Sequence, residues 1–127
     1  MDSSLEANKR VVRDFYDAVV NRKDFSAAST FLGDRYTQHN PLVGDGREGL
    51  REFIDVLRER FPQARSEVLR VFADADYVIL HVLSTRAPGT NNRAIVEIFR
   101  LEARRVVEHW DVIQEVPVRA ANPNGMF

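Results

Sequence analysis

Residues 105–115 read RVVEHWDVIQE, and this stretch decides how the chain is expected to fold. It is rich in β-branched and apolar side chains, which is typical of a buried strand. Because side chains two positions apart project from the same face of a strand, His109 and Asp111 should lie side by side, flanked by Val107 and Ile113. Burying an imidazole and a carboxyl group is costly unless they are paired or used. The stretch therefore predicts a strand that carries a site for proton transfer.

Composition limits the class of protein. The chain has 127 residues, which suits one domain (1–127) with a core of its own and a tail at about 117–127. Its net charge is −1 with both signs interspersed, which predicts that neither nucleic acid nor a membrane is a partner. The absence of cysteine excludes disulfides, thiolate metal sites and cysteine nucleophiles. We recognise no signal peptide and no apolar run long enough to span a bilayer, so we expect a cytoplasmic protein.

Two helices are expected near the start of the chain. Ser3 and Glu6 have the spacing of a capping box, and the apolar positions that follow recur at helical spacing. This pattern predicts a helix over about residues 4–21. A short helix is expected over 25–31.

A third helix is expected after a short strand at residues 36–40. Asp45 and Glu48 form another capping box, and a helical stripe of apolar residues follows until Pro62 ends the helix.

After Pro62 the apolar pattern changes from helical to strand-like. Four runs rich in Val, Ile, Leu and Phe, separated by turn signals, predict strands over 67–73, 77–86, 94–101 and 106–115. Helices followed by neighbouring strands predict an α+β fold in which an antiparallel sheet packs on three N-terminal helices.

The faces of the sheet depend on the turn at residues 103–104. If these are the two central residues of the last hairpin, His109 lies opposite Ile98. A preceding loop at 88–91 places His81 opposite Ile98 as well, so that His81, His109 and Asp111 would gather on one face. A slip of one residue would exchange the faces. Such a turn also needs a positive φ, which an arginine tolerates poorly, so we expect a longer or strained turn.

Both faces of the predicted sheet are apolar. We expect the helices to cover one face and a second copy of the chain to cover the other, giving a homodimer through the outer sheet face. Trp110 points away from Asp111 and is expected to anchor that interface, with Glu97 on the same side.

Four segments form a distinctive set: YTQHNP at 36–41, DGREG at 45–49, EHWDVIQ at 108–114 and NPNGMF at 122–127. Together they resemble the SnoaL-like polyketide cyclase family of the nuclear-transport-factor-2-like superfamily. The resemblance implies a cone-shaped fold, in which a curved antiparallel sheet wraps around three helices and encloses an apolar pocket. It also implies dimers through the outer face of the sheet. In the cyclases, an aspartate of the last strands is the acid/base in an intramolecular aldol closure without a cofactor, and Asp111 is the position that matches.

Three residues are predicted to be catalytic. Asp111 would exchange a proton with the substrate, since an apolar pocket raises the pKa of a carboxyl group toward working pH. His39 and His109 would position Asp111 or stabilise an oxyanion. The alternative for each is a structural hydrogen-bonding role. The residues expected to bind substrate are Tyr36, Asn40, His81, Phe15, Phe53 and Leu57.

A metal site is the less favoured interpretation of the same residues. Three imidazoles and one carboxylate could bind zinc or iron, but the spacing matches no compact ligand motif. The resemblance also implies a metal-free site, so no metal and no cofactor is expected.

The resulting hypothesis is a small cofactor-independent enzyme that binds a mostly apolar carbonyl compound and catalyses proton transfer, as in aldol-type cyclisation or isomerisation. One alternative is a non-catalytic binding module with the same pocket. Epoxide hydrolysis ranks lowest, because that chemistry needs an Asp-Arg-Asp set around a water and no arginine is clearly placed beside Asp111.

Overall fold

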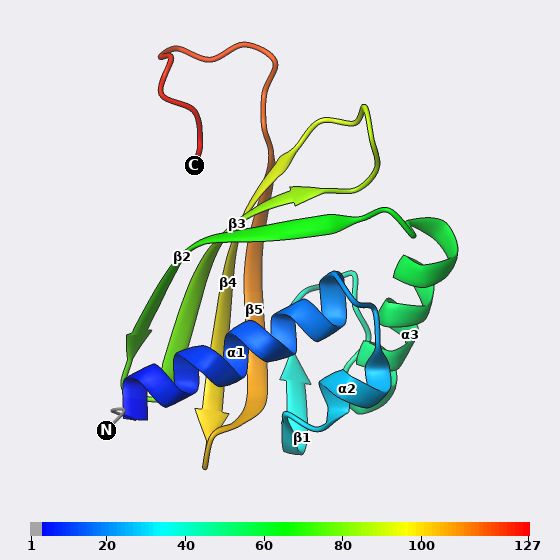
Figure 1. Ribbon diagram of the computed structural model, residues 1–127, viewed down its shortest axis with the longest axis vertical. Coiled ribbons are helices and arrows are strands. Elements are labelled where there is room, and N and C mark those ends of the chain that lie inside the picture. Colours follow the sequence, from blue (N-terminus) through cyan, green and yellow to red (C-terminus); the bar gives the residue numbers. More distant parts are fainter. Residues whose placement is uncertain (1–3) are drawn as a thin grey trace.

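The computed structural model describes residues 4–127 and has the predicted α+β class. One sheet holds all the strands in the order β1-β5-β4-β3-β2. Neighbours from β2 to β5 are antiparallel, whereas β1 lies parallel to β5 at the sheet edge (Figure 1). The elements are α1 (Ser4–Val20), α2 (Phe25–Ser29), β1 (Leu32–Gln38), α3 (Gly46–Arg60), β2 (Arg65–Asp74), β3 (Tyr77–Thr85), β4 (Arg93–Glu102) and β5 (Arg105–Glu115).

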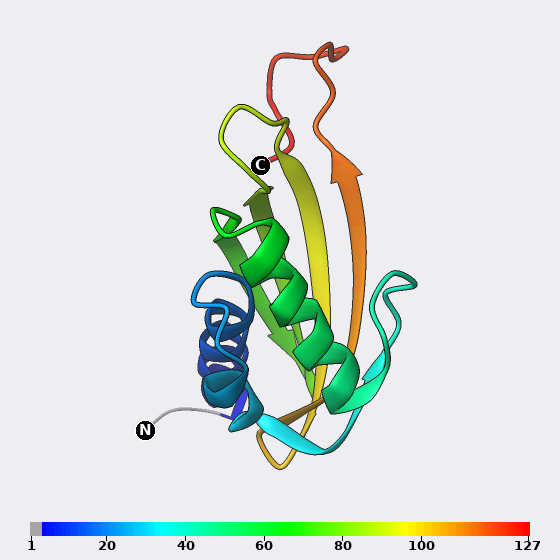
Figure 2. The same ribbon diagram turned by 90° about the vertical axis from the view of Figure 1, so that its right-hand side faces the viewer.

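The helices lie on one face of the curved sheet, which we call the inner face (Figure 2). Phe15 of α1 packs edge-on against Phe99 of β4, with ring centroids 5.9 Å apart, and against Tyr36 of β1 at 6.1 Å. Ile54 of α3 and Leu80 of β3 are buried in the same cluster. Burying each such side chain contributes about 1.5–3 kcal/mol. None of the helices within residues 4–127 is long and apolar enough to cross a membrane.

The predicted two-residue turn between β4 and β5 is confirmed, but the predicted register of the two strands is wrong. Ala103 and Arg104 have φ angles of 48° and 62°, and Glu102 pairs with Arg105, as a two-residue turn with positive φ requires. The longer turn that we allowed for is therefore not adopted. The register then shifts, because Leu101 pairs with Val106 but the residue before it, Arg100, pairs with Glu108.

The shift is a β-bulge at Val107, and it reverses the faces of β5 relative to β4. His109 lies opposite Phe99, and Asp111 lies opposite Glu97. The expected pairing of His109 with Ile98 was wrong because one extra residue follows the turn. On β3, His81 pairs with Val96 instead of the expected Ile98. Because a shift of two positions does not change the side of a strand, the side chains of β3 keep their predicted faces.

The connection from β1 to α3 also differs from its prediction. Asp45 occupies the N-cap position of α3 but makes no capping bond with its side chain. Its carboxylate accepts a hydrogen bond from the backbone N–H of Gln38 at 2.8 Å instead, so the predicted Asp45 capping box was wrong. The predicted capping box at Ser3 lies outside the described residues. A Cβ on Gly49 would lie 1.8 Å from the carbonyl oxygen of Gly44, so this loop approaches the helix where only glycine fits.

Candidate active site

A cavity of about 320 Å³ lies between α1, α3 and the inner face of the sheet. We call it the main cavity. A smaller hollow of about 60 Å³ adjoins it and shares Asn40, Glu97 and Asp111 with it. The residues predicted to form the site that line one or both of them are Phe15, Tyr36, Asn40, Phe53, Leu57, His109 and Asp111.

The carboxyl group of Asp111 faces the main cavity and its side chain is only 10% exposed. Asn40 donates from Nδ2 to both carboxylate oxygens, at 2.9 and 3.0 Å. Burial raises the pKa of Asp111 above its usual value, and the negative charge of Glu97 raises it further. The Asn40 contact acts in the opposite direction and lowers this pKa. Asp111 is therefore a largely buried carboxyl group whose protonated form is favoured relative to one in water.

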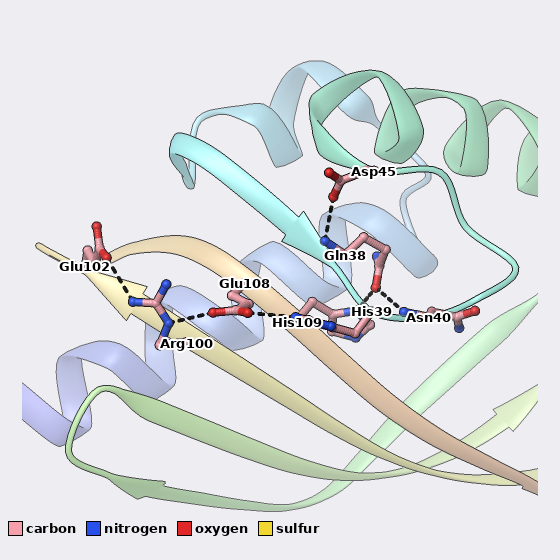
Figure 3. A network of polar contacts seen from close by, with 8 residues as sticks. All are labelled: Gln38, His39, Asn40, Asp45, Arg100, Glu102, Glu108 and His109. Carbon is pink, nitrogen blue, oxygen red and sulfur yellow. Dashed lines mark hydrogen bonds and ion pairs between the residues drawn. The ribbon is translucent and has the colours of Figure 1, made fainter.

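The ring of His109 is held from both sides. Its Nδ1 lies 2.8 Å from Oε1 of Gln38 and its Nε2 lies 2.7 Å from Oε1 of Glu97. The same Gln38 oxygen accepts the backbone N–H of Asn40 at 2.9 Å, which fixes the orientation of the amide (Figure 3). Nδ1 of His109 therefore carries a proton that it donates to Gln38. A second proton is shared between Nε2 and Glu97.

Glu97 is a site residue that the sequence analysis missed. It is only 5% exposed and lies directly across the strands from Asp111. The hydroxyl of Tyr16 donates to it, and burial followed by the charge of Glu97 raises the pKa of Tyr16 well above its usual value. The sequence did contain a signal for Glu97, because it is a lone glutamate within the apolar run 94–101. A carboxylate buried in such a run needs a partner, by the same argument that was applied to Asp111.

Glu97, His109 and Asp111 form one coupled group. Nε2 of His109 lies 3.8 Å from Oδ2 of Asp111 and 2.7 Å from Oε1 of Glu97, and Glu97 lies directly across the strands from Asp111. After the larger effect of burial, the negative charge of Glu97 raises the pKa of Asp111. Three titratable side chains are therefore held within reach of one another at the cavity wall, an arrangement suited to general acid/base chemistry.

The same three residues are the ones that could hold a metal ion. Their ligand atoms lie within 4.8 Å of one another, and no other such group occurs in residues 4–127. The set considered from the sequence, three imidazoles with one carboxylate, is not assembled, because only His109 reaches the acids.

His39 directly follows β1 and lies against Trp110 on the outer face of the sheet, away from this group. Its Nε2 contacts Oε2 of Glu108 at 2.7 Å, and its ring stacks on Trp110 with centroids 4.7 Å apart. The side chain is 41% exposed and lines neither cavity. Figure 3 shows this chain of contacts continuing through Glu108 to Arg100. The expected position at the pocket rim is wrong, because neighbouring residues of an extended segment point to opposite faces.

His81 also lies outside the cavities, on the outer face of the sheet. Its Nδ1 contacts Nη1 of Arg70 at 2.9 Å and its Nε2 contacts the carbonyl oxygen of Met126 at 3.0 Å. The expectation that His81 shares a face with Asp111 is therefore wrong, and the bulge at Val107 is the reason.

Comparisons with known proteins agree with this architecture. A family model described as a SnoaL-like domain matches residues 12–109. A candidate ketosteroid isomerase from Kribbella flavida superposes with a TM-score of 0.74 at 18% identity, covering 97% of this chain and 87% of that one. A candidate polyketide cyclase from Bacillus cereus gives 0.73 at 15% identity, with 84% and 74% covered. AclR, a candidate hydroxylase from Streptomyces galilaeus, gives 0.70 at 22% identity, with 88% and 81% covered. A search of curated proteins found no match to this chain.

Proposed function

This chain belongs to the SnoaL-like domain family of the nuclear-transport-factor-2-like superfamily, and we propose that it is a cofactor-independent enzyme acting on a carbonyl compound. The compound binds in the main cavity, and Asp111 moves a proton on the carbon next to its carbonyl. The names of the structural relatives, polyketide cyclase and ketosteroid isomerase, denote activities on carbonyl compounds and support this reaction class.

The observation that carries the proposal is the environment of Asp111. A carboxylate removes a proton from carbon most effectively when its pKa lies close to working pH. Burial and the adjacent Glu97 shift the pKa of Asp111 in that direction. Asn40 holds both oxygens of the carboxylate, so it keeps them aimed into a cavity that admits a small molecule.

The proposed reaction begins when the carboxylate of Asp111 accepts the proton. The C–H electron pair moves toward the carbonyl oxygen and forms an enolate. In an isomerisation, Asp111 returns the proton to a different carbon. In an aldol closure, the enolate carbon forms a bond to a second carbonyl, and the resulting alkoxide takes the proton from Asp111. His109, which contacts Gln38 and Glu97, keeps the carboxyl group of Glu97 beside Asp111 throughout.

The test is hydrogen exchange on a model ketone. We expect the wild-type protein to accelerate deuterium incorporation from heavy water at the carbon next to the carbonyl of 2-tetralone, followed by proton NMR. Asp111→Asn removes the base and should abolish the acceleration, whereas Asp55→Asn, on the exposed side of α3, should not. If Asp111→Asn accelerates exchange as much as the wild type, the role of Asp111 is wrong. If the wild type gives no acceleration, the catalytic proposal is wrong and a non-catalytic binding module remains.

We also propose that two copies of the chain pair through the outer face of the sheet. An apolar row crosses four strands there, since the outer-face neighbours in register are Phe72, Ile79, Ile98 and Trp110. Phe72 is 56% exposed and Val112, on the same face, is 68% exposed. A second copy would remove this apolar surface from water.

A further inference from the structure

Two arginines line the main cavity at the end away from Phe99. Arg93 begins the inner face of β4, and Arg86 follows the end of β3. The buried serine of this region, Ser84, pairs with Arg93 across the strands. The guanidinium of Arg86 lies over the ring of Phe61, 4.4 Å from its centroid, and this contact orients it.

Neither arginine has an acidic partner among residues 4–127. No ion pair joins Arg86 or Arg93 to a carboxylate in the part of the chain that the structure describes. Glu115 lies opposite Arg93 in the sheet, but its carboxylate accepts a hydrogen bond from the side chain of Asn91. Glu52 also lines the cavity, from α3, without pairing with either arginine.

The Nε atom of Arg93 is the single buried side-chain nitrogen or oxygen within residues 4–127 that has no hydrogen-bond partner. Leaving a charged donor buried and unpaired is costly, so such an atom needs an explanation. The positive charge of Arg93 also lowers the pKa of Arg86, after the larger effect of burial. Two like charges are therefore held close together at the cavity wall, and one of the two guanidinium groups has an unused donor.

We propose that Arg86 and Arg93 bind an oxyanionic group of the ligand, a carboxylate or a phosphate, while its apolar body extends toward Asp111. The inference rests on the proposed function in that it takes the main cavity as the ligand site. Guanidinium groups bind such oxyanions with paired, charge-assisted hydrogen bonds. The substrate class is thereby narrowed from an apolar carbonyl compound to one that carries an anionic group.

The inner face of β4 sets the spacing of this ligand. Arg93, Ile95 and Glu97 alternate along the face, so the cavity wall runs from a cationic end over an apolar residue to the proton-transfer group. Glu97 lies four positions along the strand from Arg93, which is about 13 Å between their Cα atoms. The anionic group should therefore lie at the opposite end of the ligand from the reacting carbon.

The test compares three naphthalene probes that differ in one substituent: 2-naphthoate, 2-naphthyl phosphate and the neutral 2-naphthalenemethanol. We expect calorimetry to give tighter binding of at least one anion than of the alcohol, by about tenfold or more. Which anion binds more tightly tells whether a carboxylate or a phosphate is preferred. Equal binding of all three, or no binding of either anion, would overturn the inference.

Variants and NMR locate the site. Arg93→Gln and Arg86→Gln should each remove most of the preference for the anion and leave binding of the alcohol within about twofold. Arg13→Gln, on the exposed face of α1, is the matched control and should change nothing. In the wild-type protein, the anion should shift the Nε–H resonance of Arg93, so the inference can be tested even if a variant fails to fold. An unshifted resonance would contradict it.

The outcome is separable from that of the proposed function. Probe binding needs no turnover, and deuterium exchange of the neutral 2-tetralone needs no anionic group. Exchange without anion preference would overturn this inference alone. Anion preference without exchange would overturn the catalytic proposal and leave the anion site in place.

Discussion

Nε2 of His109 lies 2.7 Å from Oε1 of Glu97, in a pair whose side chains are 9% and 6% exposed. The other ring nitrogen is already committed to Gln38, so the proton of this contact is shared between an imidazole and a carboxyl group. Asp111, on the same strand as His109, completes the group. Changing the charge of Glu97 should therefore alter the titration of Asp111, because that charge raises the pKa of Asp111 after the larger effect of burial.

Replacing Glu97 tests this coupling directly. Glu97→Gln removes a negative charge beside Asp111, so the pKa of Asp111 should fall below its wild-type value. It should stay above the usual range, because burial is the larger cause of the shift. A titration followed by the carboxyl carbon resonance of Asp111 measures the change. Glu67→Gln, exposed on β2, serves as the control, and an Asp111 titration that is the same in both variants would refute the coupling.

Asp111 should also make stability depend on pH. Its pKa is raised in the folded protein, so between about 4, the value expected for an unfolded chain, and the raised value, the folded state binds more protons. The free energy of unfolding therefore falls as pH rises through this window. Asp111→Asn lacks this loss, so its stability relative to the wild type should increase across the window in urea unfolding. A difference that stays constant with pH would contradict the shift, and Asp55→Asn should show no such trend.

A substitution in the turn between β4 and β5 should stabilise the folded protein. Arg104 has a φ of 62°, a conformation that costs a non-glycine residue about 1 kcal/mol or more. Arg104→Gly is expected to raise the free energy of unfolding by about 1 kcal/mol, measured by urea denaturation. Glu102→Gly, within the adjoining strand, should instead lower it by about 0.5–1 kcal/mol. Equal effects of the two substitutions would mean that the positive φ carries no strain.

The outer face offers a test of the proposed dimer. Val112→Glu places a charge on the outer face two residues from Trp110, beside the β5 end of the apolar row, and we expect it to convert a dimer to a monomer in light scattering coupled to size exclusion. Leu5→Glu, exposed on α1, is the matched control and should leave the mass unchanged. A wild-type mass equal to that of one chain would refute the proposal without need of the variant.

Much of the fold could be predicted because its signals are local. The apolar stripe of α3 and the alternation of β3 and β5 depend on residues close in sequence. The position of Asp111 beside His109 followed from the two-residue period of a strand alone. The two-residue turn at 103–104 was also recognised, although a positive φ at Arg104 was expected to oppose it.

The rest depended on relationships between strands. The bulge at Val107 leaves no local pattern, and it moved His81 away from the site and brought Glu97 into it. His39 was placed with its neighbours in sequence, whereas Gln38 and Asn40 on either side of it are the residues that reach the site. The Asp45 carboxylate was assigned to the helix that follows it, but it holds the strand that precedes it.

The extra residue at Val107 has a consequence for relatives of this chain. The number of residues between the Ala103–Arg104 turn and His109 decides which side of β5 faces the cavity. Losing a single residue there would turn the indole inward and send the imidazole and carboxyl group to the exterior, with the composition of the strand almost unchanged. When related sequences are compared, the number of residues between this turn and the His-Trp-Asp motif is therefore a better indicator of shared chemistry than the presence of the motif.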